Sequence, residues 1–88
     1  MRIVFASRAW DDYLALGEAD PKMRARVNAL IEECRRHPFT GTGKPEPLRG
    51  DLAGWWSRRV TREHRLVYRV QGTGAAQALE IAQARFHY

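Results

Sequence analysis

The chain has 88 residues, enough for one domain (residues 1–88) with a modest core but too few for a cofactor domain beside a substrate domain. Thirteen arginines and two lysines against ten acidic residues give a net charge of +5, which predicts a polyanionic partner, most simply nucleic acid; a solvated basic surface or an acidic protein partner fits equally. One cysteine excludes an intramolecular disulfide, and no cysteine or histidine cluster has the spacing of a zinc site, so we expect no metal or cofactor. No signal peptide and no apolar run of membrane-spanning length is recognisable, so we expect a cytoplasmic protein.

The first segment predicts a strand followed by a helix. Residues 2–6 are rich in β-formers, and Ser7 after them is a good N-cap. Trp10, Tyr13 and Leu14 then fall at helical spacing, which favours an amphipathic helix starting at Ser7.

A second helix is predicted from its start signal and its apolar stripe. Asp20 is the expected N-cap, and Pro21 suits the first helical position because its missing N–H has no partner there. Apolar residues then recur at helical spacing, at Met23, Val27, Leu30, Ile31 and Cys34. The helix should end at His37-Pro38, and the glycines and prolines of residues 39–48 predict a long loop, a kind of segment that is often functional.

Three strands are expected in the second half, at residues 55–61, 64–71 and 77–88. Period-two geometry assigns the residues of the middle strand to two faces, an apolar one with Leu66, Tyr68 and Val70 and a basic one with Arg65, Val67 and Arg69. The order strand, helix, helix, loop and three strands predicts an α+β fold. Two helices should pack on one face of a small antiparallel sheet and leave the basic face open.

The basic face suggests cleavage of RNA through its own 2′-hydroxyl, a reaction that needs no cofactor. It requires a base for the 2′-proton, an acid for the departing 5′-oxygen and a cation beside the phosphorane. Glu46, His87 and Arg65 have these chemical types. The sequence therefore predicts a metal-independent nuclease site built from these three residues.

Each of these basic and acidic residues also has a plainer interpretation. Glu46 lies between two prolines in the predicted loop and could be a solvated acid, and Lys44 nearby could be a solubilising charge. Arg65 could be an ordinary exposed arginine of a sheet. Arg58 and Arg59 fall on opposite faces of their strand, so only one of them can join Arg65 in a cationic surface.

The chain end, residues 84–88, is expected to be a basic strand that delivers side chains to the site. An imidazole titrates at about 6.5 and can act as acid or base, which makes His87 the best single candidate. Tyr88 could stack on a base, donate to phosphate or cover the sheet edge. His64 could be a site residue, but it is equally well explained as a turn residue.

Five segments together resemble the YoeB (Txe) family of bacterial toxins in the RelE superfamily. They are Trp10-Asp11-Asp12-Tyr13-Leu14, Gly43-Lys44-Pro45-Glu46-Pro47-Leu48, Trp56-Ser57-Arg58-Arg59, Glu63-His64-Arg65-Leu66-Val67-Tyr68 and His87-Tyr88. The resemblance covers essentially the whole chain. It implies a microbial-ribonuclease-like fold and a ribosome-dependent endonuclease of messenger RNA that inhibits translation, held inactive by a YefM/Phd-type antitoxin, with a homodimer left open.

The resemblance also implies roles for single residues. These are Glu46 as general base, Arg65 as phosphate-stabilising arginine, His87 as general acid, Tyr88 as terminal active-site tyrosine, and Lys44 and Arg59 as RNA-contacting positions. Two other functions use the same arginines without the acid and base: a non-catalytic module that binds the ribosome, and an interaction protein that engages an acidic partner. The first would inhibit translation without producing new RNA ends.

Overall fold

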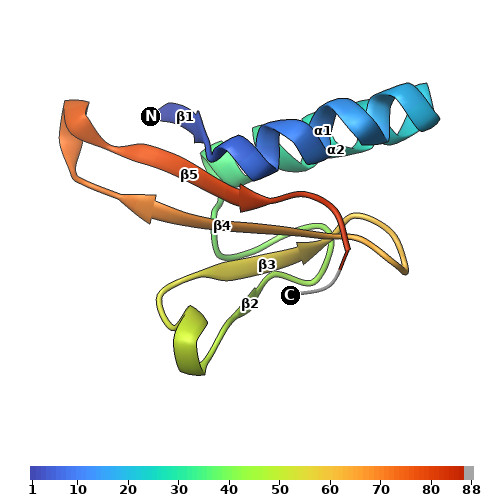
Figure 1. Cartoon of the computed structure of the whole chain (residues 1–88). Helices are drawn as coiled ribbons and strands as arrows, with labels where there is room; N and C mark the ends of the chain where they lie inside the picture. The colour runs from blue at the N-terminus through green and yellow to red at the C-terminus, as the bar shows by residue number, and fades with distance from the viewer. Residues whose placement is uncertain (87–88) are drawn as a thin grey trace.

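The computed structural model describes residues 1–86, so the predicted positions of His87 and Tyr88 lie outside the described residues. Within this range two helices lie side by side on one face of a five-stranded sheet (Figure 1). The elements in chain order are β1 (Arg2–Phe5), α1 (Ser7–Ala19), α2 (Pro21–Arg36), β2 (Glu46–Pro47), β3 (Trp56–Arg59), β4 (Arg65–Gln71) and β5 (Ala78–Gln83), with 3₁₀ turns at Gly50–Leu52 and Gly74–Ala76. The predicted α+β class is confirmed.

The two helix starts differ in how well local signals predicted them. Asp20 caps α2 as expected, because its carboxylate accepts a hydrogen bond from the Lys22 amide at 3.0 Å and Pro21 follows it. The expected cap at Ser7 is wrong: Ala6 occupies the N-cap position of α1, and Ser7 is already helical. Helix assignments commonly differ by one residue at such ends, so the location of α1 is otherwise as predicted.

The predicted stripe of α2 forms the centre of the core. Val27, Leu30, Ile31 and Cys34 are buried, and Met23 packs half-buried against them. They meet the buried side chains that β4 and β5 direct toward the helices, namely Leu66, Tyr68, Leu79 and Ile81. This core burial defines the inner face of the sheet and leaves the other face for the remaining strand residues.

The strands follow the spatial order β1-β5-β4-β3-β2. The pairs among β2 to β5 are antiparallel, as expected, whereas β1 pairs with β5 in parallel, with Ile3 opposite Leu79. A parallel pair cannot be closed by a tight hairpin and needs a long crossover. Here α1 and α2 form part of that connection, which is why both helices cover the same face.

The last strand is shorter than predicted. β5 ends at Gln83, and residues 84–86 form a bend, so the expectation of one strand from residue 77 to the chain end is wrong for this segment. The amide of Ala84 leaves the ladder and donates to Asp12 Oδ2 at 3.1 Å. Phe86 adopts a φ of 65°, which no regular strand contains. Contacts with distant residues, among them Asp12 on α1, therefore hold the chain in a bend where β5 ends.

Candidate active site

The strand register assigns three of the predicted site residues to one side of the sheet. Glu46 on β2 pairs with Ser57 on β3, and Arg59 on β3 pairs with Arg65 on β4. Directly paired residues point to the same side, and alternate residues of a strand share that side. The resulting surface faces away from the helices, and we call it the outer face: Glu46, Ser57, Arg59, Arg65, Val67 and Arg69.

Strand β3 lies between Glu46 on β2 and Arg65 on β4. The two residues are therefore two strand spacings apart across the sheet and two residues apart along it, which corresponds to roughly 12 Å between their Cα atoms. Glu46 is exposed and Arg65 is half-buried. Side chains of this length can both reach a single phosphodiester held between them, so the register allows the predicted pair to act on one linkage.

The segment that carries Lys44 runs beside Arg59 of the outer face. The Arg59 amide donates to the Gly43 carbonyl at 2.7 Å, so the chain just before Lys44 runs beside Arg59. Lys44 itself has a φ of 52°, a left-handed conformation uncommon for a residue other than glycine. Both side chains are exposed and cationic, as contacts to RNA phosphates require.

Arg65 is hydrogen-bonded to Phe86, the last residue that the structure describes. Its backbone amide donates to the Phe86 carbonyl at 3.1 Å, so the residue that precedes His87 is bonded to the predicted phosphate-binding arginine. The Arg65 Nε is buried, and among residues 1–86 it has no hydrogen-bond partner. Buried donors are rarely left unpaired, because doing so costs about 1–3 kcal/mol. The Arg65 Nε is therefore a donor that is not used by the described residues.

The outer face is less uniformly basic than the sequence predicted. Arg69 forms an ion pair with Glu80 of β5 at 2.6 Å, and its guanidinium lies 4.3 Å from the centre of the Trp55 ring. Val67 between the arginines is only 2% exposed. The cationic surface is therefore concentrated at Lys44, Arg59 and Arg65.

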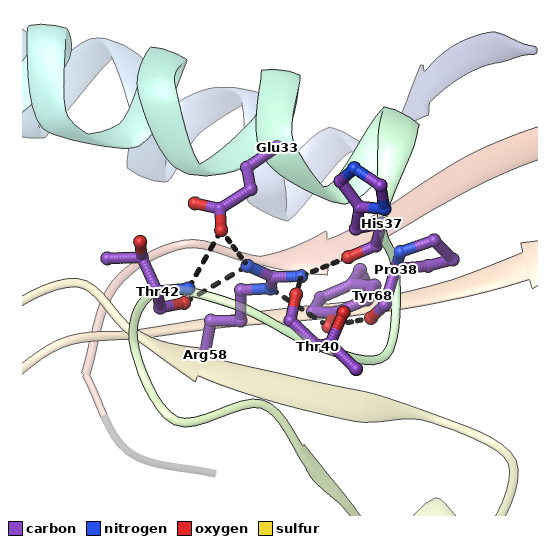
Figure 2. Close-up of polar contacts among 7 residues, drawn as sticks. All are labelled: Glu33, His37, Pro38, Thr40, Thr42, Arg58 and Tyr68. Carbon is purple, nitrogen blue, oxygen red and sulfur yellow. Dashed lines mark hydrogen bonds and ion pairs between the residues drawn. The ribbon is translucent and has the colours of Figure 1, made fainter.

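Arg58, the other arginine of the predicted pair, points into the core and is completely buried (Figure 2). Its guanidinium donates to the carbonyl oxygens of His37, Thr40 at 2.7 Å and Thr42 at 3.0 Å. These carbonyls belong to the segment that leaves α2 and leads toward Lys44 and Glu46. A buried cation thus organises the loop that carries two predicted site residues.

Two further side chains complete this network. Tyr68 accepts from Arg58 Nε at 3.2 Å and donates to the Pro38 carbonyl at 2.5 Å. Glu33 on α2 lies 3.6 Å from the guanidinium and accepts from the Thr42 amide at 2.8 Å (Figure 2). The Thr42 hydrogen bonds, and secondarily Arg58, lower the pKa of the Glu33 carboxyl. The sequence contained no signal for this network, because strand parity only separates Arg58 from Arg59.

The groups beside this network predict a loss of stability at alkaline pH. Burial raises the pKa of Cys34 from 9.0 to about 11 and that of Tyr68 from 10.0 to about 12. Both groups bind their proton more tightly when folded, so their contribution is complete below pH 9 and is lost as the pH rises toward 11 and 12. We expect the free energy of unfolding to fall less in the Cys34→Ala variant than in the wild type between pH 8 and pH 10.5, as measured by urea unfolding at these two pH values. An identical decrease in both proteins would contradict this assignment.

A separate apolar pocket lies away from these residues, between β1 and the two helices. It is lined by Ile3, Phe5, Trp10, Tyr13, Asn28, Ile31 and Glu32, and none of the predicted site residues that lie within the described part of the chain contributes to it. Within residues 1–86 no cluster of three or more His, Cys, Asp or Glu side chains could hold a metal ion. In the same range no helix is both long and apolar enough to cross a membrane. The candidate site is accordingly the surface of the outer face.

Comparison with known proteins identifies the family of the chain. Residues 5–88 match the family described as YoeB-like toxin of bacterial type II toxin-antitoxin system. Toxin YoeB of Streptomyces coelicolor is 51% identical over 88 residues, which are the full length of both chains.

Solved structures show the same similarity. The YoeB/ParE toxin from Agrobacterium tumefaciens is 53% identical and superposes with a TM-score of 0.96, covering all of both chains. The toxin in a heterotetrameric YoeB-YefM toxin-antitoxin complex from Staphylococcus aureus is 37% identical, with a TM-score of 0.86 over 100% of this chain and 98% of that one. Sequence and structure thus agree over the full length, and the chain belongs to the YoeB family of toxins of bacterial type II toxin-antitoxin systems.

Proposed function

We propose that this chain is a ribosome-dependent endonuclease that cleaves messenger RNA and so inhibits translation. The 2′-hydroxyl of the nucleotide before the cut loses its proton to a base, and its oxygen attacks the adjacent phosphorus. The bond from phosphorus to the 5′-oxygen breaks, and that oxygen takes a proton from an acid. The products are a 2′,3′-cyclic phosphate and a 5′-hydroxyl. Because side chains supply the base, the acid and the cation, the proposed reaction needs neither metal nor cofactor.

The proposed roles follow the chemistry of the outer face. Glu46 takes the 2′-proton, Arg65 neutralises the charge that develops on the phosphorane, and His87 protonates the 5′-oxygen. Tyr88, next to the acid, contacts the reacting nucleotide. Lys44 and Arg59 bind flanking phosphates and hold the RNA against the sheet.

One observation carries the proposal. The register directs Glu46, Arg59 and Arg65 to the same side of the sheet, and Arg65 retains a buried Nε without a partner among residues 1–86. The same arginine is bonded through its amide to Phe86, the residue before His87. A carboxylate, a guanidinium with a free donor and the chain end that carries an imidazole are the groups that this cleavage requires.

A YefM-type antitoxin is the proposed protein partner. The Staphylococcus aureus relative was solved in a heterotetrameric YoeB-YefM complex, and we propose that this chain forms a complex of the same class. An acidic segment that folds on contact would cover Arg59 and Arg65 and neutralise them. Such a segment would also cover the end that carries His87 and Tyr88, which accounts for inhibition of the nuclease.

Cleavage on programmed ribosomes tests the proposed reaction. Primer extension on messenger RNA should reveal new 5′ ends with the wild type, and the His87→Ala variant should produce them at least about 100-fold more slowly, because the leaving oxygen lacks its acid. A single 2′-deoxy nucleotide at the cleavage site should block the wild type, because the nucleophile is missing. The His37→Ala variant changes an exposed histidine outside the outer face and is the control.

The same experiment distinguishes the non-catalytic alternative. A module that only occupies the ribosome would inhibit translation without new 5′ ends, and the His87→Ala variant would inhibit as strongly as the wild type. Equal cleavage of the deoxy and the ribose substrate would contradict attack by the 2′-oxygen.

A further inference from the structure

The bend after β5 is held by polar groups from distant parts of the chain. Buried Asp12 on α1 accepts from the Ala84 amide at 3.1 Å and lies 3.3 Å from the Arg85 guanidinium. Gln83 donates through its side-chain amide to the carbonyls of Arg85 at 2.9 Å and Phe86 at 3.2 Å. The path of the chain up to Phe86 is therefore set by specific hydrogen bonds rather than by strand pairing.

The backbone amide and carbonyl of Phe86 are bonded to two consecutive residues, His64 just before β4 and Arg65 at its first position. The Phe86 amide donates to His64 Nδ1 at 2.9 Å, and the Phe86 carbonyl accepts from the Arg65 amide at 3.1 Å. The rings of His64 and Phe86 also meet, with 5.5 Å between their centres. This pair of bonds ties the end of the described chain to the proposed phosphate-binding arginine.

Phe86 adopts a backbone conformation that needs such support. Its φ of 65° lies in the left-handed region, which a bulky aromatic residue rarely adopts. Such a conformation persists only where surrounding contacts compensate for it. The bond from the Phe86 amide to His64 is one of these contacts, and it is made by a side chain that the proposed reaction does not otherwise use.

We propose that His64 is a positioning residue for the chain end: its Nδ1 holds the amide of Phe86 and so fixes the backbone of the residue that precedes the proposed acid, His87. The proposal deepens the proposed function and rests on it for the role of His87. His64 touches no reacting atom, so its effect on catalysis passes entirely through the backbone at Phe86. A direct consequence is that any side chain with an acceptor at the same place can substitute for the imidazole.

Two substitutions separate the hydrogen bond from the bulk of the side chain. His64→Asn keeps an acceptor, because Oδ1 of asparagine is attached to the same carbon position as Nδ1 of histidine. His64→Leu keeps similar bulk but no acceptor. His37→Leu makes the same change at an exposed histidine far from the bend and controls for the loss of an imidazole as such.

Hydrogen exchange in the free protein tests the structural half of the proposal without any RNA. The Phe86 amide should exchange roughly tenfold faster in His64→Leu than in the wild type, in line with the loss of one hydrogen bond. His64→Asn and His37→Leu should exchange at the wild-type rate. Core amides of α2 should be unchanged in all four proteins, which verifies that they are folded. Equal exchange of the Phe86 amide in His64→Leu and wild type would overturn the proposal.

Single-turnover cleavage on ribosomes tests the catalytic half. One substrate carries the natural 5′-oxygen at the cut, and the other carries sulfur there, which leaves as a thiolate and needs no acid. His64→Leu should cleave the oxygen substrate about 10- to 100-fold more slowly than wild type, as expected for a misplaced acid, but the sulfur substrate at nearly the wild-type rate. His64→Asn should behave as wild type on both substrates.

The outcomes distinguish a failure of this inference from a failure of the proposed function. Equal slowing of both substrates in His64→Leu, or no recovery in His64→Asn, would overturn the positioning role while leaving the nuclease assignment intact. If the wild type cleaved neither substrate, the proposed function would fail, and the role of His64 in catalysis would fall with it.

Discussion

Replacing Arg58 with methionine is expected to lower the free energy of unfolding by about 3–5 kcal/mol. Arg58 is completely buried and supplies the donors for the carbonyls of His37, Thr40 and Thr42. Methionine fills much of the same space but donates nothing, so three carbonyls lose the guanidinium donor together and the Glu33 carboxylate loses the nearby cation while keeping the Thr42 amide. For a domain of this size such a loss corresponds to a fall of at least about 12 °C in Tm.

Urea unfolding followed by circular dichroism measures this effect, with Arg59→Met as the matched control. Arg59 is the next residue along β3 but is exposed on the outer face, so its replacement should change stability by no more than about 0.5 kcal/mol. Arg58→Lys should be intermediate, because lysine keeps the charge but not the planar fork of donors. Equal midpoints for Arg58→Met and Arg59→Met would show that the buried network does not stabilise the fold.

Replacing Glu46 with alanine is expected to slow messenger cleavage by about 10²–10⁴-fold, the range typical of a lost general base. Glu46 is exposed on the two-residue strand β2, so the substitution should leave the fold intact. Binding to the ribosome should also persist, because it depends on the arginines. The loss should therefore appear in the single-turnover rate and not in the toxin concentration that half-saturates the ribosomes.

Glu63→Ala is the control for this prediction, because Glu63 is an exposed acid in the turn between β3 and β4. It should cleave at the wild-type rate and arrest growth as the wild type does. Full cleavage by Glu46→Ala would remove Glu46 from the mechanism, whereas weaker ribosome binding at an unchanged rate would make it a contact residue instead of a base.

The two predictions are connected through the loop between α2 and β2. Arg58 and Glu33 hold residues 37–42 from the inside of the fold, and the Arg59 amide then binds the Gly43 carbonyl on the way to Lys44. Gly43 is required at this point, because its φ is 85° and an added Cβ would lie 2.9 Å from the Arg59 carbonyl oxygen. Glu46 is therefore placed by contacts of β3, although it follows a loop in the sequence.

Features that depend on a few neighbouring residues could be predicted. The cap at Asp20 and the apolar stripe of α2 are confirmed, because capping and periodic burial act over one or two turns. In β4 the predicted core residues Leu66 and Tyr68 are buried, but so is Val67 on the face predicted to be open and basic. The family was also identifiable, because five short segments in the same order are specific together. The catalytic roles of Glu46, Arg65, His87 and Tyr88 stay predictions.

Features that depend on contacts between distant residues were missed or predicted wrongly. The strand expected to continue to residue 88 bends at Ala84 because of Asp12, which is 72 positions away in the sequence. His64 was indistinguishable from a turn residue until its contact with Phe86, 22 positions away, was visible. Sequence alone assigned Arg58 and Arg59 to opposite faces but could not say which one is buried.

The amino-acid sequence by itself determined where the two helices lie, which side of α2 and β4 meets the core, and to which toxin family the chain belongs. It did not determine every strand: β2 lies inside the segment predicted as a loop, and β5 ends before its predicted end. Only the tertiary structure decided that Arg58 lies in the core, that Glu46, Arg59 and Arg65 share the outer face, and that the chain reaches Arg65 at Phe86. The physical reason is the distance along the sequence over which each kind of interaction acts. Local patterns reflect the preferences of adjacent residues, whereas register and buried polar networks arise from pairings that exist only after the helices and the sheet have packed together.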